Sequence, residues 1–215
     1  MITYFKEHHA EILSWLVSHI WLAAVPVVLG LIIALPIGWL AQRYRWLYAP
    51  LVSIAGLLYT IPSIALFVVL PGLLGTKVLD PINVAVALTI YTVALLVRVV
   101  ADGLASVPDD VAQAATAMGY GRFQRLVAVE LPIAVPVIAA GLRVAAVSNV
   151  SLVAVAATIG VPELGQLFTN GFQLSYFPPI LIGIVLCVAL ALVFDTVIVL
   201  VTRMLTPWRR AVQPS

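Results

Sequence analysis

Residues 108–132 read PDDVAQAATAMGYGRFQRLVAVELP and form a polar, helix-competent stretch in an otherwise strongly apolar chain. Pro108 fixes its own backbone for a helix start, and Asp109 and Asp110 place negative charge near the positive end of that helix. The alanine-rich residues that follow favour a helix, and Gly119 can take the left-handed conformation that ends one. The stretch therefore predicts a short helix parallel to a membrane surface, with a low alanine surface that another protein can approach closely.

The composition of the whole chain indicates that lipid surrounds most of it. Of its 215 residues, 63% are hydrophobic and 9% are charged, against roughly 25% charged in a soluble globular domain. We predict an all-α integral membrane protein with about five transmembrane helices. About 20 apolar residues suffice to cross a bilayer core, and the candidate spans lie at about 20–41, 51–74, 82–100, 131–159 and 180–202.

These spans are predicted to form a single domain over 1–215, with its core at roughly 20–203 and a connecting loop at about 108–130 between the third and fourth spans. The first run is too long and too late to be a cleaved signal peptide. Ahead of it, Phe5, Ile12 and Leu16 recur at nearly helical spacing among charged residues and histidines. They fit a short interfacial helix or a frayed polar terminus.

The distribution of arginine and lysine indicates how the spans are oriented, because these residues accumulate in short cytoplasmic loops. Five spans with the N-terminus outside and the C-terminus inside leave Lys6 and Lys77 outside and Arg143 within a span. The remaining arginines all fall inside, namely Arg43, Arg45, Arg98, Arg122, Arg125, Arg203, Arg209 and Arg210. This arrangement also places residues 108–130 in the cytoplasm.

The loop at 108–130 resembles a known motif in both residues and spacing. Gln113-Ala114-Ala115 is followed after three residues by Gly119, and after nine more by Val129-Glu130-Leu131-Pro132. This pattern is similar to the cytoplasmic "EAA" loop of permease subunits in binding-protein-dependent ABC importers, with Gln113 in place of Glu and Val129 in place of Ile. The resemblance implies an ATPase-coupling role for Gln113, Ala114, Ala115, Gly119, Leu131 and Pro132.

Two further stretches resemble permeases of glycine betaine, carnitine and choline importers. Residues 57–66, LLYTIPSIAL, are similar to a Gln-Thr-Ile-Pro-Ser-Leu-Ala stretch common in those proteins, with Tyr59 in place of Gln. Residues 140–165 resemble their fourth span and the outer loop that follows it.

The resemblance implies a type I importer fold in the cytoplasmic membrane of a bacterium. Its implied partners are ABC ATPase subunits, a second identical or similar permease subunit and an extracytoplasmic substrate-binding protein. ATP and Mg are expected on the ATPase, with no cofactor on this chain. The implied solute is glycine betaine, carnitine, choline or proline betaine, and an amino acid or another small solute is the alternative.

Polar residues near the middle of the second predicted span are candidates for a translocation path. Pro62 removes a backbone donor there, and the hydroxyls of Thr60 and Ser63 can satisfy the carbonyl that it frees. Together with Tyr59 they either shape the path or form only a structural kink.

Ionisable and polar side chains in the later spans have the same two interpretations. A charge inside a bilayer is costly, so Arg143 and Asp195, on antiparallel spans at similar depth, are expected to pair structurally or to act in gating. Ser148 and Asn149 either line a polar path or form interhelical hydrogen bonds.

The outer loop contains a predicted helix and a few charged residues. Leu164, Leu167, Phe168 and Phe172 fall on one helical face, as in a re-entrant or interfacial helix. Glu163, Lys77 and Asp80 are candidates for docking a binding protein, with simple solvation as the alternative.

Missing motifs narrow the function further. The sequence has no Gly-x-x-x-x-Gly-Lys-Ser/Thr phosphate loop, no Gly-x-Ser-x-Gly and no His-Glu-x-x-His, so the ATPase activity is assigned to another chain and a membrane hydrolase is disfavoured. The single Cys187 and three N-terminal histidines predict no metal site, and a scattered net charge of +2 predicts no nucleic-acid binding. A membrane scaffold or channel subunit, which predicts no nucleotide dependence, is the alternative from another class.

Overall fold

A computed structural model describes residues 2–210, and Met1 and residues 211–215 of the predicted domain lie outside the described residues, as do the side chains of Arg209 and Arg210. The described residues contain helices and no strand, which confirms the all-α class. The elements are α1 (Ile2–Arg43), α2 (Arg45–Thr60), α3 (Ser63–Leu74), α4 (Pro81–Ala105), α5 (Asp109–Ala117), α6 (Arg122–Arg125), the π-helix η1 (Leu126–Glu130), α7 (Leu131–Val153), the 3-10 helix η2 (Ala154–Ile159), α8 (Gln166–Gln173), α9 (Phe177–Leu205) and η3 (Pro207–Arg210).

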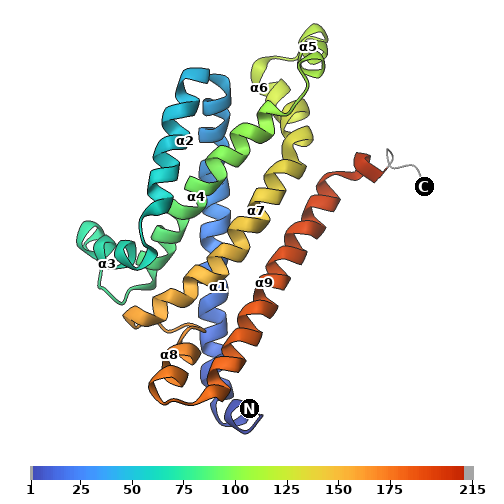
Figure 1. The fold of residues 1–215 in the computed structure, drawn as a ribbon. Helices are drawn as coiled ribbons and strands as arrows, with labels where there is room; N and C mark the ends of the chain where they lie inside the picture. The colour runs from blue at the N-terminus through green and yellow to red at the C-terminus, as the bar shows by residue number, and fades with distance from the viewer. Residues whose placement is uncertain (1, 211–215) are drawn as a thin grey trace.

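The helix α4 lies at the centre of the bundle. The helices α1, α2 and α7 pack against it, and α7 packs in turn against α9 (Figure 1). Small residues permit this close packing. A Cβ atom added at Gly38 of α1 would lie 2.6 Å from the Cβ atom of Val100 in α4, so a larger residue there would push the helices apart.

Two apolar clusters form the core of the described residues. One includes Leu22, Phe67 and Leu164 and joins α1, α3, α4, α7, α8, α9 and the segment between α7 and α8. The other includes Leu96 and Leu126 and joins the other end of α1, α4 and α7 to η1. Neither cluster includes a residue of α5.

The first helix is longer than the predicted span 20–41. It runs from Ile2 to Arg43 with a local departure from helical geometry at His8 (φ −113°, ψ 15°). This kink sets residues 2–7 apart as a short helical segment ahead of the long helix, so these residues are helical and not frayed. That the segment lies at a membrane interface stays a prediction.

The second predicted span, 51–74, is not one helix. It consists of α2 and α3, which are bent by 99° at the intervening break. Ile61 is extended (φ −65°, ψ 129°) because the ring of Pro62 disfavours the helical conformation at the residue before it. The prediction of a kink within a continuous span was therefore too mild.

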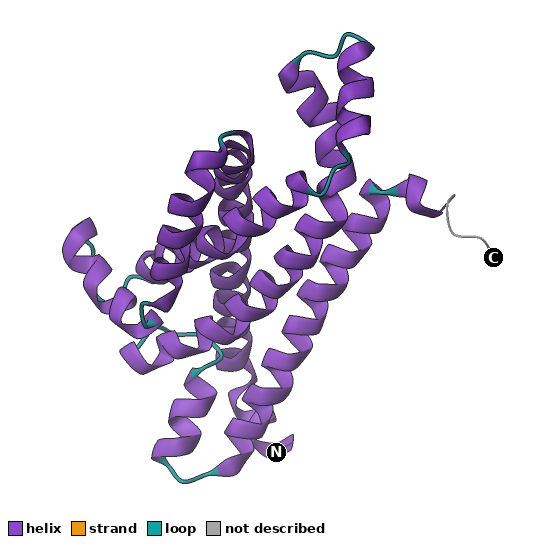
Figure 2. Cartoon of the chain, turned by 45° about the horizontal axis from the view of Figure 1, so that its top comes forward, coloured by secondary structure: helices purple, strands orange, loops and turns teal. Residues whose placement is uncertain are grey.

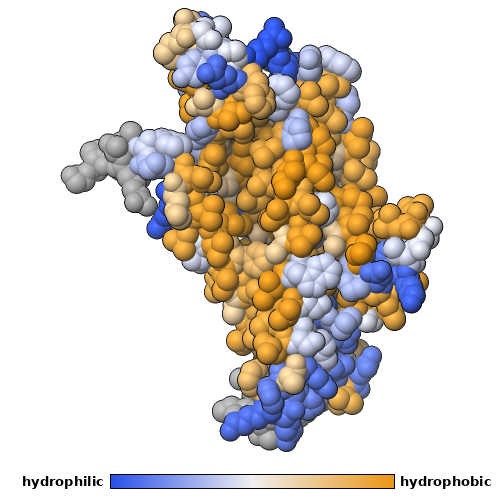
Figure 3. All heavy atoms as spheres, turned by 180° about the vertical axis from the view of Figure 1, so that it is seen from behind, coloured by the Kyte–Doolittle hydropathy of each residue, from blue (hydrophilic) through white to orange (hydrophobic). Residues whose placement is uncertain are grey.

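The arrangement of the helices gives the molecule two distinct ends. The described residues contain four helices long and apolar enough to cross a membrane, and the bent pair is a fifth candidate. Figure 3 shows a broad apolar band on one face, with polar atoms gathered beyond it at both ends. The N-terminal end and α8 lie opposite α5, which projects from the bundle (Figures 1 and 2).

Candidate coupling site and polar pathway

The start of α5 follows the local signals in the sequence. Pro108 precedes the helix in an extended conformation (φ −60°, ψ 138°), and Asp109 and Asp110 occupy its first turn. Asp110 adds a local bond, because the Val111 N–H donates to its Oδ1 atom over 2.9 Å. The acids thus lie where unpaired N–H groups and the positive end of the helix dipole favour them.

The end of α5 is closed around Gly119, which takes the predicted left-handed conformation (φ 90°). The Tyr120 N–H donates to the Ala115 carbonyl over 3.1 Å, and the Gly119 N–H donates to the Thr116 carbonyl over 3.0 Å. This pair of bonds around a left-handed glycine is the Schellman motif. It satisfies the last carbonyls of α5 without help from a partner.

Most of the predicted coupling residues in α5 face outward. Gln113 and Ala114 are exposed, whereas Ala115 is buried against the chain itself. Met118, just past the helix, is 70% exposed. The outer surface of α5 is therefore low and carries an uncovered apolar side chain at its end, as expected of a surface that another protein contacts.

Arg125 connects α5 to the start of α7. Its Nη1 atom donates to the Thr116 Oγ1 atom of α5 over 3.0 Å. Its Nε atom donates to the Oε1 atom of the largely buried Glu130 over 2.6 Å. Hydrogen bonds between ionised groups are short and strong, so the guanidinium group ties the exposed helix to the bundle.

The π-helix η1 makes this connection possible. Arg125 immediately precedes η1, and Glu130, five residues later, is its last residue. A π-helix pairs residues five apart, whereas an α-helix pairs residues four apart. Leu131 and Pro132, both half-buried, then begin α7, so the predicted coupling residues at this end lie on the helix that receives the connection.

Three of the predicted pathway residues lie together. Tyr59, Ser148 and Asn149 line one cleft with Tyr91 and Thr92, and in this structure the cleft is too narrow to hold a water molecule. The Asn149 Nδ2 atom donates to the Thr92 Oγ1 atom over 2.9 Å. The rings of Tyr59 and Tyr91 meet edge to face, with their centroids 5.7 Å apart.

The other second-span candidates lie at the break between α2 and α3. Pro62 precedes α3, and Ser63 is its first residue. The Thr60 hydroxyl donates to the Leu57 carbonyl over 2.7 Å, while the Ile61 carbonyl accepts a hydrogen bond from the Tyr91 hydroxyl. Thr60 therefore satisfies a carbonyl about one turn before Pro62, as predicted. The Ser63 hydroxyl forms no such bond among the described residues, and Tyr91 binds the carbonyl at the break itself.

Arg143 and Asp195 lie apart from this cleft and join α7 to α9. The Arg143 Nε atom donates to Asp195 Oδ1 over 2.6 Å, and the Nη2 atom donates to Asp195 Oδ2 over 2.9 Å. This two-pronged geometry matches the guanidinium fork to the carboxylate. The side chains remain 45% and 29% exposed, so part of the pair faces the surroundings of the chain.

The outer loop differs from the expectation of exposed docking charges. Glu163 is fully buried, and its Oε2 atom lies 2.8 Å from the Nδ1 atom of the equally buried His19. The same oxygen accepts a hydrogen bond from the Gly165 N–H over 2.7 Å. Glu163 is therefore an internal anchor, since it cannot reach a soluble partner from this position.

The other two docking candidates have different environments. Asp80 accepts a hydrogen bond from the Ile82 N–H over 3.0 Å and thereby caps α4. Lys77 is exposed. Elsewhere in the described residues, no three His, Cys, Asp or Glu side chains lie close enough to hold a metal ion.

Residues 26–211 match the family described as "Binding-protein-dependent transport system inner membrane component". The chain belongs to this family. It is thus an inner-membrane component of a transport system, which favours the importer interpretation over a scaffold or channel subunit.

Curated relatives of this inner membrane component match it over nearly their whole length. "Osmoprotectant import permease protein OsmW" from Salmonella typhimurium (strain LT2) is 36% identical over 209 residues, which cover 96% of this chain and 97% of the relative. "Glycine betaine/carnitine/choline transport system permease protein OpuCD" from Bacillus subtilis (strain 168) is 28% identical over 209 residues, which cover 97% and 90%.

Solved structures confirm the importer permease fold. A chain of the MetNI methionine ABC transporter, described in inward-facing conformations, superposes with a TM-score of 0.80 at 23% identity, covering 94% of this chain and 99% of that one. A chain of an amino acid ABC transporter crystallised with histidines gives a TM-score of 0.75 at 17% identity, covering 95% and 98%. At these identities the likeness shows the fold alone.

Several contacts of this inner membrane component arise only in the fold. His19 and Glu163 are each lone ionisable residues in apolar surroundings, the same signal that suggested pairing Arg143 with Asp195. Tyr91 gave no comparable signal, because its partner is a backbone carbonyl. The bond between Arg125 and Glu130 was hidden because helical periodicity of 3.6 does not align residues five apart.

Proposed function

We propose that this inner membrane component is the permease subunit of an ATP-driven importer for a compatible solute such as glycine betaine, carnitine, choline or proline betaine. The observation that carries the coupling role is the projecting helix α5, joined to α7 through Arg125. The solute class is supported by the names of the full-length relatives. The amino-acid alternative has weaker support, because the amino-acid transporters resemble this chain in fold alone.

In this proposal the permease works with a second identical or similar permease subunit, two ATPase subunits and an extracytoplasmic binding protein. ATP and Mg bind to the ATPase subunits, and this chain performs no hydrolysis and binds no cofactor of its own. The arginine-rich end that carries α5 faces the cytoplasm, since the positive-inside tendency favours that orientation. The N-terminal end and α8 face the binding protein.

Movement passes from the ATPase to the pathway through named contacts. Closure of the ATPase subunits pushes α5, and the bonds of Arg125 to Thr116 and Glu130 transmit that push to η1 and α7. The helix α7 carries Ser148 and Asn149, which line the narrow cleft opposite Tyr59 and Tyr91. Displacement of α7 would therefore open or close the cleft in step with ATP hydrolysis.

The proposal is tested in liposomes that contain the full chain with its cognate ATPase and binding protein. Uptake of radiolabelled glycine betaine, carnitine, choline and methionine is measured together with ATP hydrolysis. We expect ATP-dependent uptake of at least one quaternary ammonium solute. Ala114→Asp and Gly119→Asp, both at exposed positions, should uncouple hydrolysis from the binding protein. Leu205→Asp, which adds the same charge at the exposed end of α9, should not.

Each alternative gives a different result in this assay. Uptake of methionine without uptake of quaternary ammonium solutes would support the amino-acid importer. Solute flux that does not depend on ATP would support a channel. Hydrolysis that remains coupled in both α5 variants would remove α5 as the coupling element while leaving the solute class intact.

A further inference from the structure

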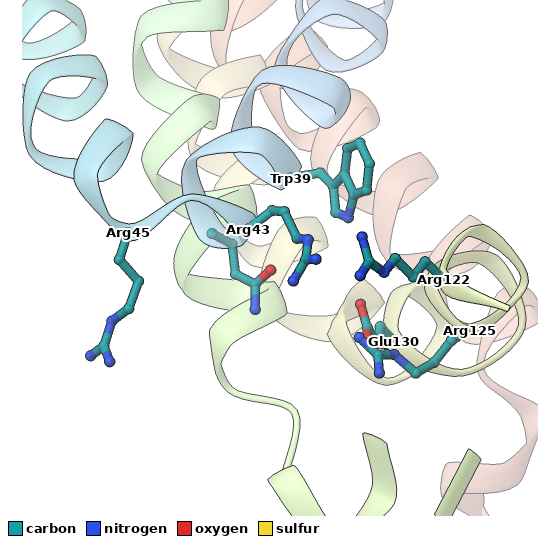
Figure 4. A pocket seen from close by; sticks show the side chains of 7 residues that line it. Trp39, Arg43, Arg45, Arg122, Arg125 and Glu130 are labelled. Carbon is teal, nitrogen blue, oxygen red and sulfur yellow. Dashed lines mark hydrogen bonds and ion pairs between the residues drawn. The ribbon is translucent and has the colours of Figure 1, made fainter. Parts of the chain in front are cut away.

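A basic cavity of about 200 Å³ lies at the α5 end of the molecule, on the bundle side of α5. It forms where the turn between α1 and α2 approaches α6 and η1 (Figure 4). Its lining includes Trp39, Arg43, Arg45, Arg122, Arg125 and Glu130. Since one water occupies about 30 Å³ in the liquid, the cavity has room for a tetrahedral phosphate group with its oxygens.

The cavity carries an excess of positive charge. Arg125 pairs with Glu130, but no acidic side chain among the described residues forms an ion pair with Arg43, Arg45 or Arg122. Three guanidinium groups therefore remain without a carboxylate partner beside one neutral pair. Like charges gathered in this way favour an anion between them.

The side chains are arranged so that two of the unpaired arginines can share one ligand. Arg43 and Arg122 extend toward each other from α1 and α6, with the Trp39 indole beside them, whereas Arg45 extends to one side (Figure 4). Guanidinium forks match the oxygens of phosphate, and an indole N–H adds a further donor. The donors of the cavity therefore suit a phosphate group better than an uncharged or cationic solute.

The surroundings of the cavity indicate that the phosphate belongs to a lipid. Trp46 at the start of α2 and Trp208 after α9 are exposed at the same end of the bundle, and tryptophans gather at the depth of lipid headgroups. Ile133 and Val137 follow Glu130 at three and seven residues and are exposed, so an apolar stripe leads from the cavity along α7. Acyl chains can lie on such a stripe.

We propose that this cavity binds the headgroup phosphate of an anionic phospholipid, with Arg43 and Arg122 as its principal ligands. Basic pockets between transmembrane helices on the cytoplasmic side bind anionic headgroups. A soluble partner fits less well, because α5 projects from the bundle (Figure 1) and meets that partner first. The lipid phosphate would bridge the end of α1 and α6, and it would offset the repulsion between the positive charges of Arg43 and Arg122.

The site is tested by titrating phosphatidylglycerol into the purified full chain in detergent and counting bound lipid by native mass spectrometry. Removing one arginine near a membrane surface costs about 1 kcal/mol, or about five-fold in affinity. We therefore expect Arg43→Gln and Arg122→Gln each to weaken binding about five-fold and the double variant about twenty-five-fold. Arg203→Gln, which removes the same charge from the end of α9, should change binding less than two-fold.

Two further arms identify the source of the phosphate. Phosphatidylcholine, which bears no net charge, should bind equally weakly to the wild type and the double variant. Millimolar inorganic phosphate should not displace phosphatidylglycerol, and displacement would overturn the lipid assignment in favour of a soluble phosphate. Unchanged lipid binding in the double variant, or equal loss in Arg203→Gln, would overturn the site.

A last comparison tests whether the cavity binds an acidic group of a protein instead of a lipid. If the double variant binds phosphatidylglycerol normally but no longer retains the cognate ATPase, the cavity holds an acidic group of that partner and the lipid proposal is wrong. Because lipid binding is measured without solute or ATP, its failure leaves the importer function untouched, and failure of import leaves the lipid site untouched.

Discussion

The two segments that flank α7 are built in opposite ways. The outer loop after it, residues 154–173, buries Glu163, Leu164 and Leu167 completely and joins them to α1 and the bundle core. The coupling segment before it, residues 109–130, buries little, and Phe123 is 74% exposed. Both are short helices joined by turns, so the difference lies in what each one packs against.

Because of this difference, we expect the outer loop to contribute mainly to the stability of the fold and the coupling segment mainly to coupling with the ATPase. The outer loop is completed by its own chain, because its carboxylate and apolar side chains find partners within the bundle. The coupling segment is held by the end cap at Gly119, the side chain of Arg125 and the buried Leu126, and it leaves most of its remaining surface free. Substitutions in the outer loop should therefore lower the free energy of unfolding, whereas those in the coupling segment should act mostly on local order and on coupling.

The largest expected loss of stability comes from His19→Ala. This change leaves the fully buried carboxyl group of Glu163 with the Gly165 N–H as its remaining partner and removes a fully buried imidazole. A buried polar group that loses a hydrogen-bond partner costs about 1–3 kcal/mol, and with the cavity that the imidazole leaves the loss reaches about 3–5 kcal/mol. The free energy of unfolding, measured in detergent by helix content during denaturation, should fall by that amount. Uptake of quaternary ammonium solutes would then fail because less protein is folded, and not because ATP hydrolysis is uncoupled from transport.

A double-mutant cycle is the control for this prediction. His19→Ala combined with Glu163→Ala removes both polar partners, so the combined loss should be smaller than the sum of the single losses. Additive losses would mean that the two side chains do not interact. A loss from His19→Ala below about 1 kcal/mol would also contradict the view that the outer loop is anchored by its own chain.

Arg125→Gln should have an intermediate effect that is confined to the coupling segment. It removes a charge-assisted bond to the largely buried Glu130 and a bond to Thr116. Hydrogen bonds to charged groups contribute about 1.5–3 kcal/mol. Amide hydrogen exchange should speed up in α5 and η1 while the midpoint of global unfolding changes little.

Gln124→Ala is the matched control, since Gln124 is exposed on the same short helix. It should leave both hydrogen exchange and ATPase coupling unchanged. If Arg125→Gln lowers global stability as much as His19→Ala does, the two segments are equally integrated into the bundle and the contrast between them disappears.

Local signals in the sequence predicted the coupling segment better than any other part. Pro108, the two following acids and Gly119 act on their own backbone, so their effect needs no knowledge of the fold. The apolar runs likewise predicted the all-α class and the presence of long apolar helices, because lipid requires such helices whatever their packing. These inferences depend on neighbours in the sequence or on the solvent.

Of the contacts between distant residues, the pair of Arg143 and Asp195 was predicted, because two lone charges in apolar spans need partners. Other distant contacts were beyond the same reasoning. The 99° bend at Pro62 needed Tyr91, 30 residues later, to bind the Ile61 carbonyl. The burial of Glu163 depends on His19, 144 residues earlier, and an isolated acid after a proline in a loop suggests exposure. The cleft formed by Tyr59, Ser148 and Asn149 likewise exists only after α2, α4 and α7 pack together.

The smallest expected change, Gly119→Ala, isolates the end cap of α5. A Cβ atom added there would meet nothing within 4 Å, but the residue must keep φ near 90°. The left-handed conformation costs a residue with a side chain about 1–2 kcal/mol. Hydrogen exchange at the amides of Gly119 and Tyr120 should therefore accelerate about five- to thirty-fold, with no measurable shift in global unfolding.

Gly121→Ala provides the control in the same turn. Its Cβ atom would also meet nothing within 4 Å, yet its φ of −67° suits any residue. Gly121→Ala should leave exchange and coupling as in the wild type, so any difference between the two variants reports the backbone conformation alone. If exchange in α5 accelerates equally in both variants, the loss of glycine flexibility explains the effect. The left-handed cap at Gly119 is then not what holds the end of α5.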